Sequence, residues 1–165
     1  MARGGSYKPM PDLSKIKYFT EEDATVIRDG FDIFDHGKQL TDLKEIMDYL
    51  DKMQAFEKFP TVYYLIQKMT EANPKGVNFK TFLETFNGYL GSAETKVGLQ
   101  KLFEAIDYDE NQYLDKERLK GLAKEIGEKV NDEDIEFLIE EGYNCPTGKV
   151  DQDAFVKMML KASGR

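Results

Sequence analysis

A pattern of apolar residues occurs four times along the chain, and it constrains the fold more than any other feature. Each copy has an amphipathic stretch, a loop with an apolar residue near its middle, and a second amphipathic stretch. The loops start at Asp35, Thr70, Asp107 and Tyr143, which gives spacings of 35, 37 and 36 residues. The sequence therefore predicts an all-α fold built from four helix–loop–helix units.

Further apolar positions indicate how these units associate. The mid-loop residues are Leu40, Val77, Leu114 and Val150, and the apolar residues that open the second helices are Leu43, Phe82, Leu119 and Phe155. A mid-loop residue of this kind pairs with its counterpart in a neighbouring loop through a short antiparallel β contact. This arrangement is typical of EF-hands, so we predict four EF-hand motifs in two lobes with short β pairings between their loops.

Glycines between the second and third units mark the boundary between the predicted lobes. Gly88 and Gly91 lie within four residues and make an uninterrupted helix unfavourable. We predict a flexible N-terminal tail over residues 1–18, an N-terminal lobe over 19–90 and a C-terminal lobe over 91–165. The tail carries more basic than acidic residues, so it is either a solvated segment or a docking arm.

The third and fourth units resemble centrin. The residues that carry the resemblance are Leu119-Lys120-Gly121-Leu122-Ala123-Lys124-Glu125-Ile126-Gly127-Glu128-Lys129-Val130, followed by Asn131-Asp132-Glu133-Asp134. Centrins have a very similar helix ending in Lys-Glu-Leu-Gly-Glu, followed by a capped acidic turn. The similarity covers roughly residues 95–162, whereas the first half matches only the general pattern of the calmodulin-like superfamily. The resemblance implies a cytoplasmic protein of the cytoskeleton, in a cilium or flagellum (axoneme), a basal body or a centriole.

Three of the four loops lack the chemistry of a calcium site. A working loop has twelve residues, with oxygen ligands at positions 1, 3, 5, 7 and 9 and a bidentate Glu at 12. With Leu43 in the second helix, the first loop runs only from Asp35 to Asp42, four residues too short. Positions 1, 3, 5 and 12 are Thr70, Ala72, Pro74 and Thr81 in the second loop, and Tyr143, Cys145, Thr147 and Ala154 in the fourth. We therefore predict no standard calcium site in these loops.

The third loop is the one serious metal candidate. Its possible ligands are Asp107, Asp109, Asn111, the backbone carbonyl of Tyr113, and Asp115. Position 12 is Arg118, which removes two ligands and adds a repelling charge. Two alternatives remain: an acidic loop closed internally by Arg118, or one weakly bound calcium ion. We predict that the protein requires no cofactor.

Charge and residue content narrow the classes of function. The net charge of −8 argues against nucleic-acid binding, and no apolar run has the length of a membrane span. The single histidine, His36, and the single cysteine, Cys145, lie in different loops of different predicted lobes, so we expect no enzyme activity. The aromatic run Phe56, Phe59, Tyr63 and Tyr64 is either core or a partner surface.

These features favour a non-catalytic, light-chain-like protein that clamps an amphipathic, basic helix of a larger cytoskeletal or motor protein, largely without calcium. Partner-binding candidates at helical spacing in the C-terminal lobe are Phe103, Leu119, Leu122, Ile126, Leu138, Phe155, Met158 and Met159. The alternatives are a weak calcium sensor that uses the third loop only, and a calmodulin-like regulatory subunit of a motor or enzyme complex.

Overall fold

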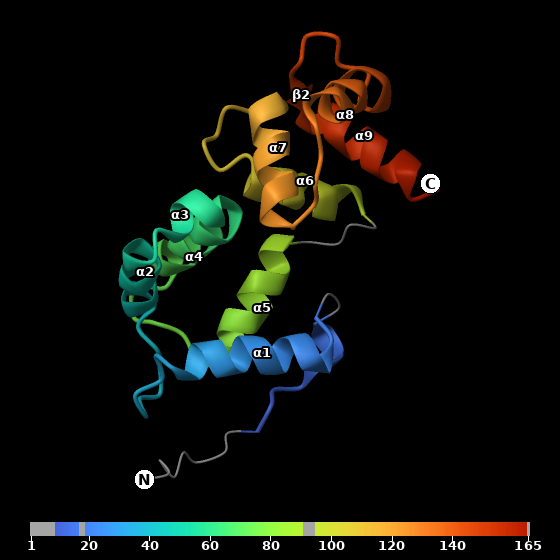
Figure 1. Ribbon diagram of the computed structural model, residues 1–165. Helices are drawn as coiled ribbons and strands as arrows, with labels where there is room; N and C mark the ends of the chain where they lie inside the picture. The colour runs from blue at the N-terminus through green and yellow to red at the C-terminus, as the bar shows by residue number, and fades with distance from the viewer. Residues whose placement is uncertain (1–8, 17–18, 91–94, 165) are drawn as a thin grey trace.

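The computed structural model describes residues 9–16, 19–90 and 95–164, and most of these residues are helical (Figure 1). The first half contains the short 3-10 helix η1 (Leu13–Lys15) and the helices α1 (Glu21–Asp32), α2 (Leu43–Lys52), α3 (Ala55–Lys58), α4 (Pro60–Ala72) and α5 (Phe79–Leu90). The second half contains α6 (Lys96–Ile106), α7 (Lys116–Glu125), α8 (Asp132–Phe137), the π-helical segment η2 (Leu138–Gly142) and α9 (Gln152–Ala162). The predicted all-α class is confirmed for the described residues.

Polar side chains set the starts of several helices. Thr20 and Asp23 form a reciprocal capping box at the start of α1, and Asn131 and Asp134 form another at α8. Each box satisfies backbone N–H groups that a helix start leaves without a partner. The acidic residues of both first turns also favour the helix dipole.

The loops of the second half meet in a small antiparallel sheet. Strand β1 (Tyr113–Leu114) pairs with β2 (Val150–Asp151), and Leu114 lies opposite Val150. These are the two mid-loop residues that the sequence predicted as partners. Both side chains are fully buried, so the pairing also closes the core beneath it.

The loops of the first half meet differently from the prediction. Val77 pairs with Thr41, not with Leu40, through two backbone hydrogen bonds of 2.8 and 3.0 Å. Thr41 is 3% exposed and Leu40 is 40% exposed. The polar residue is buried because its backbone groups are satisfied by Val77 and because Gly76, with φ of +85°, lets the two loops approach closely. The choice of Leu40 from its apolar character was therefore wrong.

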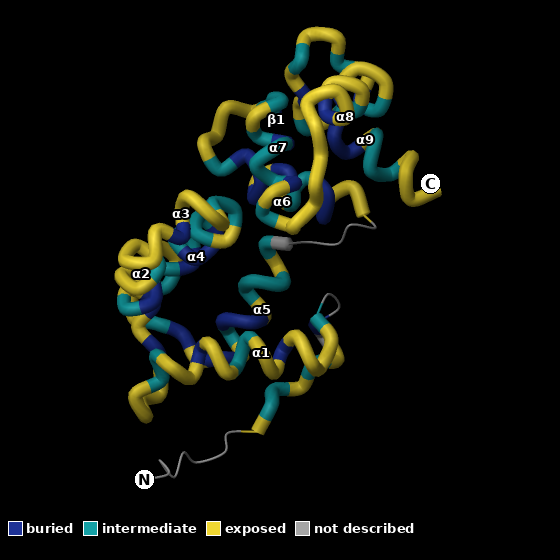
Figure 2. Tube along the Cα trace, viewed as in Figure 1, coloured by how far each residue is buried: buried dark blue, intermediate teal, exposed yellow. Residues whose placement is uncertain are grey.

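Two apolar cores lie along the chain, one in each half. The first gathers side chains from α1, α2, α4 and α5, including Phe31, Met69 and Leu83; the second gathers side chains from α6 to α9, including Leu99, Phe103 and Phe155. Figure 2 shows the buried residues on the inner faces of these helices. No helix among the described residues is both long enough and apolar enough to cross a membrane.

The described part of the predicted tail, residues 9–16, contacts the first core. Ile16 belongs to the first core, and Met10 and Leu13 pack against it. Three apolar side chains spaced by three residues lie on one side of the segment, and burying them against the core ties it down. Residues 1–8 and 17–18 lie outside the described residues.

Candidate functional site

The third loop, between α6 and α7, is closed by hydrogen bonds among its own groups. The carboxylate of Asp107 accepts hydrogen bonds from the backbone N–H groups of Asn111 (3.1 Å) and Gln112 (2.8 Å). Burial raises the pKa of Asp107, the Gln112 N–H bond opposes this shift, and the nearby Asp109 carboxyl adds to it. Asp115 accepts from the backbone N–H of Arg118 at 2.9 Å and so caps α7. Two predicted ligands therefore already accept backbone hydrogen bonds: Asp107 within the loop and Asp115 at the start of α7.

Arg118 occupies the place where a calcium loop carries its glutamate. Its Nη2 lies 2.7 Å from Oδ2 of Asp109, and its side chain is 14% exposed. This ion pair uses an oxygen that a calcium ion would need and sets a fixed positive charge beside it. Among the described residues, no cluster of three His, Cys, Asp or Glu side chains could hold a metal ion. In this arrangement the Asp109 carboxylate is paired with Arg118, as in the predicted alternative of an acidic loop closed internally.

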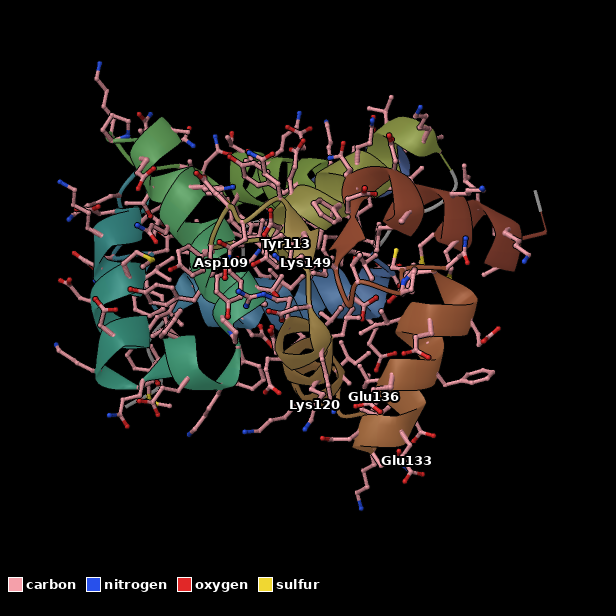
Figure 3. The ribbon with its side chains drawn as sticks, turned by 90° about the horizontal axis from the view of Figure 1, so that it is seen from above. Asp109, Tyr113, Lys120, Glu133, Glu136 and Lys149 are labelled. Carbon is pink, nitrogen blue, oxygen red and sulfur yellow. The ribbon has the colours of Figure 1, made fainter. Side chains whose placement is uncertain are left out.

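The remaining candidate ligands lie on the same side of the second half. Tyr113 is in β1, and its ring lies 4.2 Å from the ammonium of Lys149, while Asn111 donates its backbone N–H within the loop. Figure 3 labels Tyr113 and Lys149 at this contact. The loop residues thus lie together, but the carboxylates of Asp107 and Asp109 already bond groups of the same loop and of Arg118.

The first loop holds a feature that the sequence analysis missed. Because Thr41 is the mid-loop residue, Glu45, not Asp42, stands where the twelfth ligand belongs. From Asp35 to Glu45 the loop has eleven residues, one short of twelve, which corrects the predicted shortening by four. Glu45 Oε2 lies 2.8 Å from Nε2 of His36, so this carboxylate also has a partner inside its own loop.

A signal for this register was present in the sequence. In the structure an aspartate caps the second helix in three of the units: Asp42 at α2, Asp115 at α7 and Asp151 at α9. In each case the residue before the cap is the mid-loop residue. Aligning these caps instead of the apolar residues would have identified Thr41.

The second and fourth loops use their unusual residues for packing and local bonds. Thr70 Oγ1 donates to the carbonyl of Ile66, and Asn73 donates to that of Met69. Tyr143 is buried and stacks on Phe155 with ring centroids 6.3 Å apart. These contacts belong to a stable fold and supply no ion ligands.

The chain is similar to several curated proteins over most of its length. Caltractin ICL1e of Paramecium tetraurelia is 26% identical over 144 residues, which cover 86% of this chain and 81% of that protein. Calcium-binding protein CML19 of Arabidopsis thaliana is 28% identical over 145 residues, covering 87% of each. Centrin-1 of Bos taurus is 28% identical over 156 residues, covering 94% of this chain and 87% of that protein. These relatives support the predicted resemblance to the centrin/calmodulin-like EF-hand superfamily. No family model matches it.

The predicted partner-binding residues lie at three different depths. Phe103, Leu119 and Phe155 are buried inside the second core. The side chains packed against that core and partly exposed are Leu122, Leu138, Met158 and Met159. Ile126 is 68% exposed. The side chains of the first group are at most 5% exposed, so they offer little surface to a partner in this conformation.

Acidic side chains of α8 are paired with lysines of α7. Lys116 bonds Glu136 at 2.6 Å and Asp132 at 2.9 Å, and Lys120 also bonds Asp132. Hydrogen bonds from Lys120 and Lys116 lower the pKa of Asp132 to about 2. Figure 3 shows Lys120, Glu136 and Glu133 gathered around α8. These contacts tie α7 to α8 across the outside of the half.

Proposed function

We propose that this protein is a non-catalytic, light-chain-like EF-hand protein that binds an amphipathic helix of a larger cytoskeletal protein largely without calcium. The observation that carries this proposal is the ion pair between Arg118 and Asp109, which fills the third loop with an internal charge. A hand whose ion site is closed internally needs something other than calcium to set its conformation. A bound helix can do this, because a ligand shifts a conformational equilibrium by its difference in affinity for the two states.

The proposal includes a division into two EF-hand lobes, residues 19–90 and residues 91–165. The separate apolar cores of the two halves support this division. The pairing of Thr41 with Val77, and of Leu114 with Val150, supports two hands in each lobe. Under this proposal each lobe is one cooperative unit and a potential helix clamp.

The proposed docking face is on the C-terminal lobe. Ile126 offers an exposed apolar side chain, and Leu122 and Met158 lie at the core edge, where opening of the helices would expose them. Methionine adapts to differently shaped partners because its side chain is flexible and polarisable. The net charge of −8 favours a basic helix as the partner.

The names of the relatives support the proposed setting. Centrins and caltractins are among the proteins to which this chain is similar. By analogy we place this protein in the cytoskeleton of a cilium or flagellum, a basal body or a centriole. The same analogy supports the proposal that the protein has no enzyme activity of its own.

Crosslinking mass spectrometry in native extract tests the proposal, with the full chain as bait and with chelator or calcium added. We expect a partner crosslinked to the C-terminal lobe through a basic amphipathic segment, in both conditions. Ile126→Asp should weaken recovery of this partner at least several-fold, because it puts a charge into an apolar contact. Val26→Asp is the matched control, since Val26 is 67% exposed on α1 in the other half. Recovery that depends on calcium, or that is equal for both variants, would contradict the proposal.

A calcium sensor is the second candidate. The name of one relative, calcium-binding protein CML19, favours it, and so does the carboxylate of Glu45 at the end of the first loop, four residues after Thr41. In this case calcium should change both the recovered partners and the fold. A calorimetric titration with calcium distinguishes the two candidates, because only a sensor should bind calcium tightly.

A further inference from the structure

The third loop reaches across to the first half of the chain through Tyr108. Its ring stacks on that of Tyr64 in α4, with centroids 4.6 Å apart and planes inclined by 13°. Phe56 of α3 meets both rings edge-on, at 6.2 Å from Tyr108 and 5.8 Å from Tyr64. These are favourable aromatic geometries, and they join residues more than forty positions apart in the sequence.

Arg118 lies against the same ring. Its guanidinium carbon is 3.4 Å from the centroid of Tyr108, a cation–π contact, while its Nη2 bonds Asp109. One face of a ring has no room for two such neighbours at these distances, so Tyr108 lies between Arg118 and Tyr64. The planar guanidinium is suited to this double role, because it stacks and donates hydrogen bonds at the same time.

A second contact joins the halves at the other end of α7. Glu125 accepts hydrogen bonds from the backbone N–H (3.2 Å) and the hydroxyl (3.1 Å) of Thr61, in the first turn of α4. The residue before α4, Phe59, gives no side-chain cap, so Glu125 supplies the cap from the other half. A carboxylate at this position is also favoured by the helix dipole.

The residues that join the halves lie on one face of α7 and one face of α4. Arg118 and Glu125 are seven residues apart on α7, and Thr61 and Tyr64 are three apart on α4, so each pair lies on one helix face. The two faces meet with Tyr108 between them. Burial raises the pKa of Glu125, while its bonds from Thr61 and the charge of Arg118 act in the opposite direction. The carboxylate is thus held inside the contact.

We infer that Arg118 takes the structural place of the loop ion and also docks the second half of the chain on the first, through Tyr108 and Tyr64. An ion would need Asp109 and a carboxylate at position 12. Here Arg118 occupies position 12, pairs with Asp109 and contacts Tyr108, whose ring packs on α4. Calcium binding by the third loop and docking of the halves are therefore mutually exclusive. This coupling does not depend on whether the protein binds a partner helix.

Nitrogen-15 NMR relaxation of the full chain tests the inference, because it reports the tumbling time of each half separately. We expect the two halves of the unmodified protein to share one rotational correlation time. Tyr64→Ala and Arg118→Ala should split this value, and each half should then tumble faster, approaching a body of half the mass. Arg118→Lys should restore the single value only in part, since an ammonium keeps the charge but does not stack as a plane.

Phe137→Ala is the matched control, because Phe137 is 69% exposed on α8. It should leave the single correlation time unchanged. Dispersed amide signals from both halves show that each variant is folded, and Glu125→Gln offers a milder variant that should raise the mobility of the α4 start without removing a ring. Independent tumbling of the halves in the unmodified protein would overturn the inference. A single correlation time retained in both Tyr64→Ala and Arg118→Ala would overturn it as well.

Discussion

At the residue scale, the charges of α7 are paired over most of its length. Arg118 meets Asp109 and Tyr108, Lys120 meets Asp132, and Glu125 meets Thr61. The effect of Arg118 on a calcium site could be predicted from the sequence, because a guanidinium at position 12 replaces the bidentate carboxylate. Its contact with Tyr108 could not, since no local pattern indicates which ring a long side chain will cover.

Asp132 gives a prediction for acid stability. Its pKa of about 2 lies below the ordinary 3.8, because Lys120 and Lys116 stabilise the charged form. The stabilisation is present above pH 3.8 and is lost as the pH falls towards 2. Asp132→Asn should therefore lower the melting temperature slightly at neutral pH and reduce its further drop between pH 3.8 and 2. Glu133→Gln, exposed in the same turn, is the control; an unchanged acid profile for Asp132→Asn would show that these ion pairs contribute nothing.

At the element scale, the pairing of the first two loops depends on one glycine. A Cβ on residue 76 would lie 2.3 Å from the carbonyl oxygen of Thr41, and its φ of +85° is unfavourable for any side chain. Gly76→Ala should cost more than about 2 kcal/mol of unfolding free energy, because strain and a backbone clash add. Gly88→Ala, in α5 with open space around its Cβ, should instead stabilise by about 0.5–1 kcal/mol. Urea denaturation measures both, and equal effects would contradict the role of Gly76.

The helices were largely predictable, whereas the first loop was not. Capping residues such as Thr20 and Asn131 and the apolar spacing gave the helix positions, because both act locally. The mid-loop residue Thr41 is buried by backbone pairing with a loop 36 residues further along, so its polarity was misleading. The position of Glu45 was missed for the same reason.

At the scale of the whole molecule, the aromatic run of α3 and α4 takes a role between the two predicted alternatives. Tyr64 is not among the residues of either apolar core; it packs on Tyr108 of the other half. Phe59 and Phe56 remain about half exposed. A contact between halves cannot be read from periodicity, because it depends on how two folded units meet. The apolar cores within each half could be predicted, since helical spacing reports which face is buried.

A calorimetric titration with calcium at physiological magnesium tests whether Arg118 closes the third loop in place of calcium. For the unmodified protein we expect at most one weak site. Arg118→Glu should bind calcium at least tenfold more tightly, because it restores two oxygen ligands and removes a positive charge. Arg118→Gln, which removes the charge without restoring the carboxylate, should gain much less. Two or more micromolar sites in the unmodified protein, or no gain in affinity for Arg118→Glu, would contradict the account.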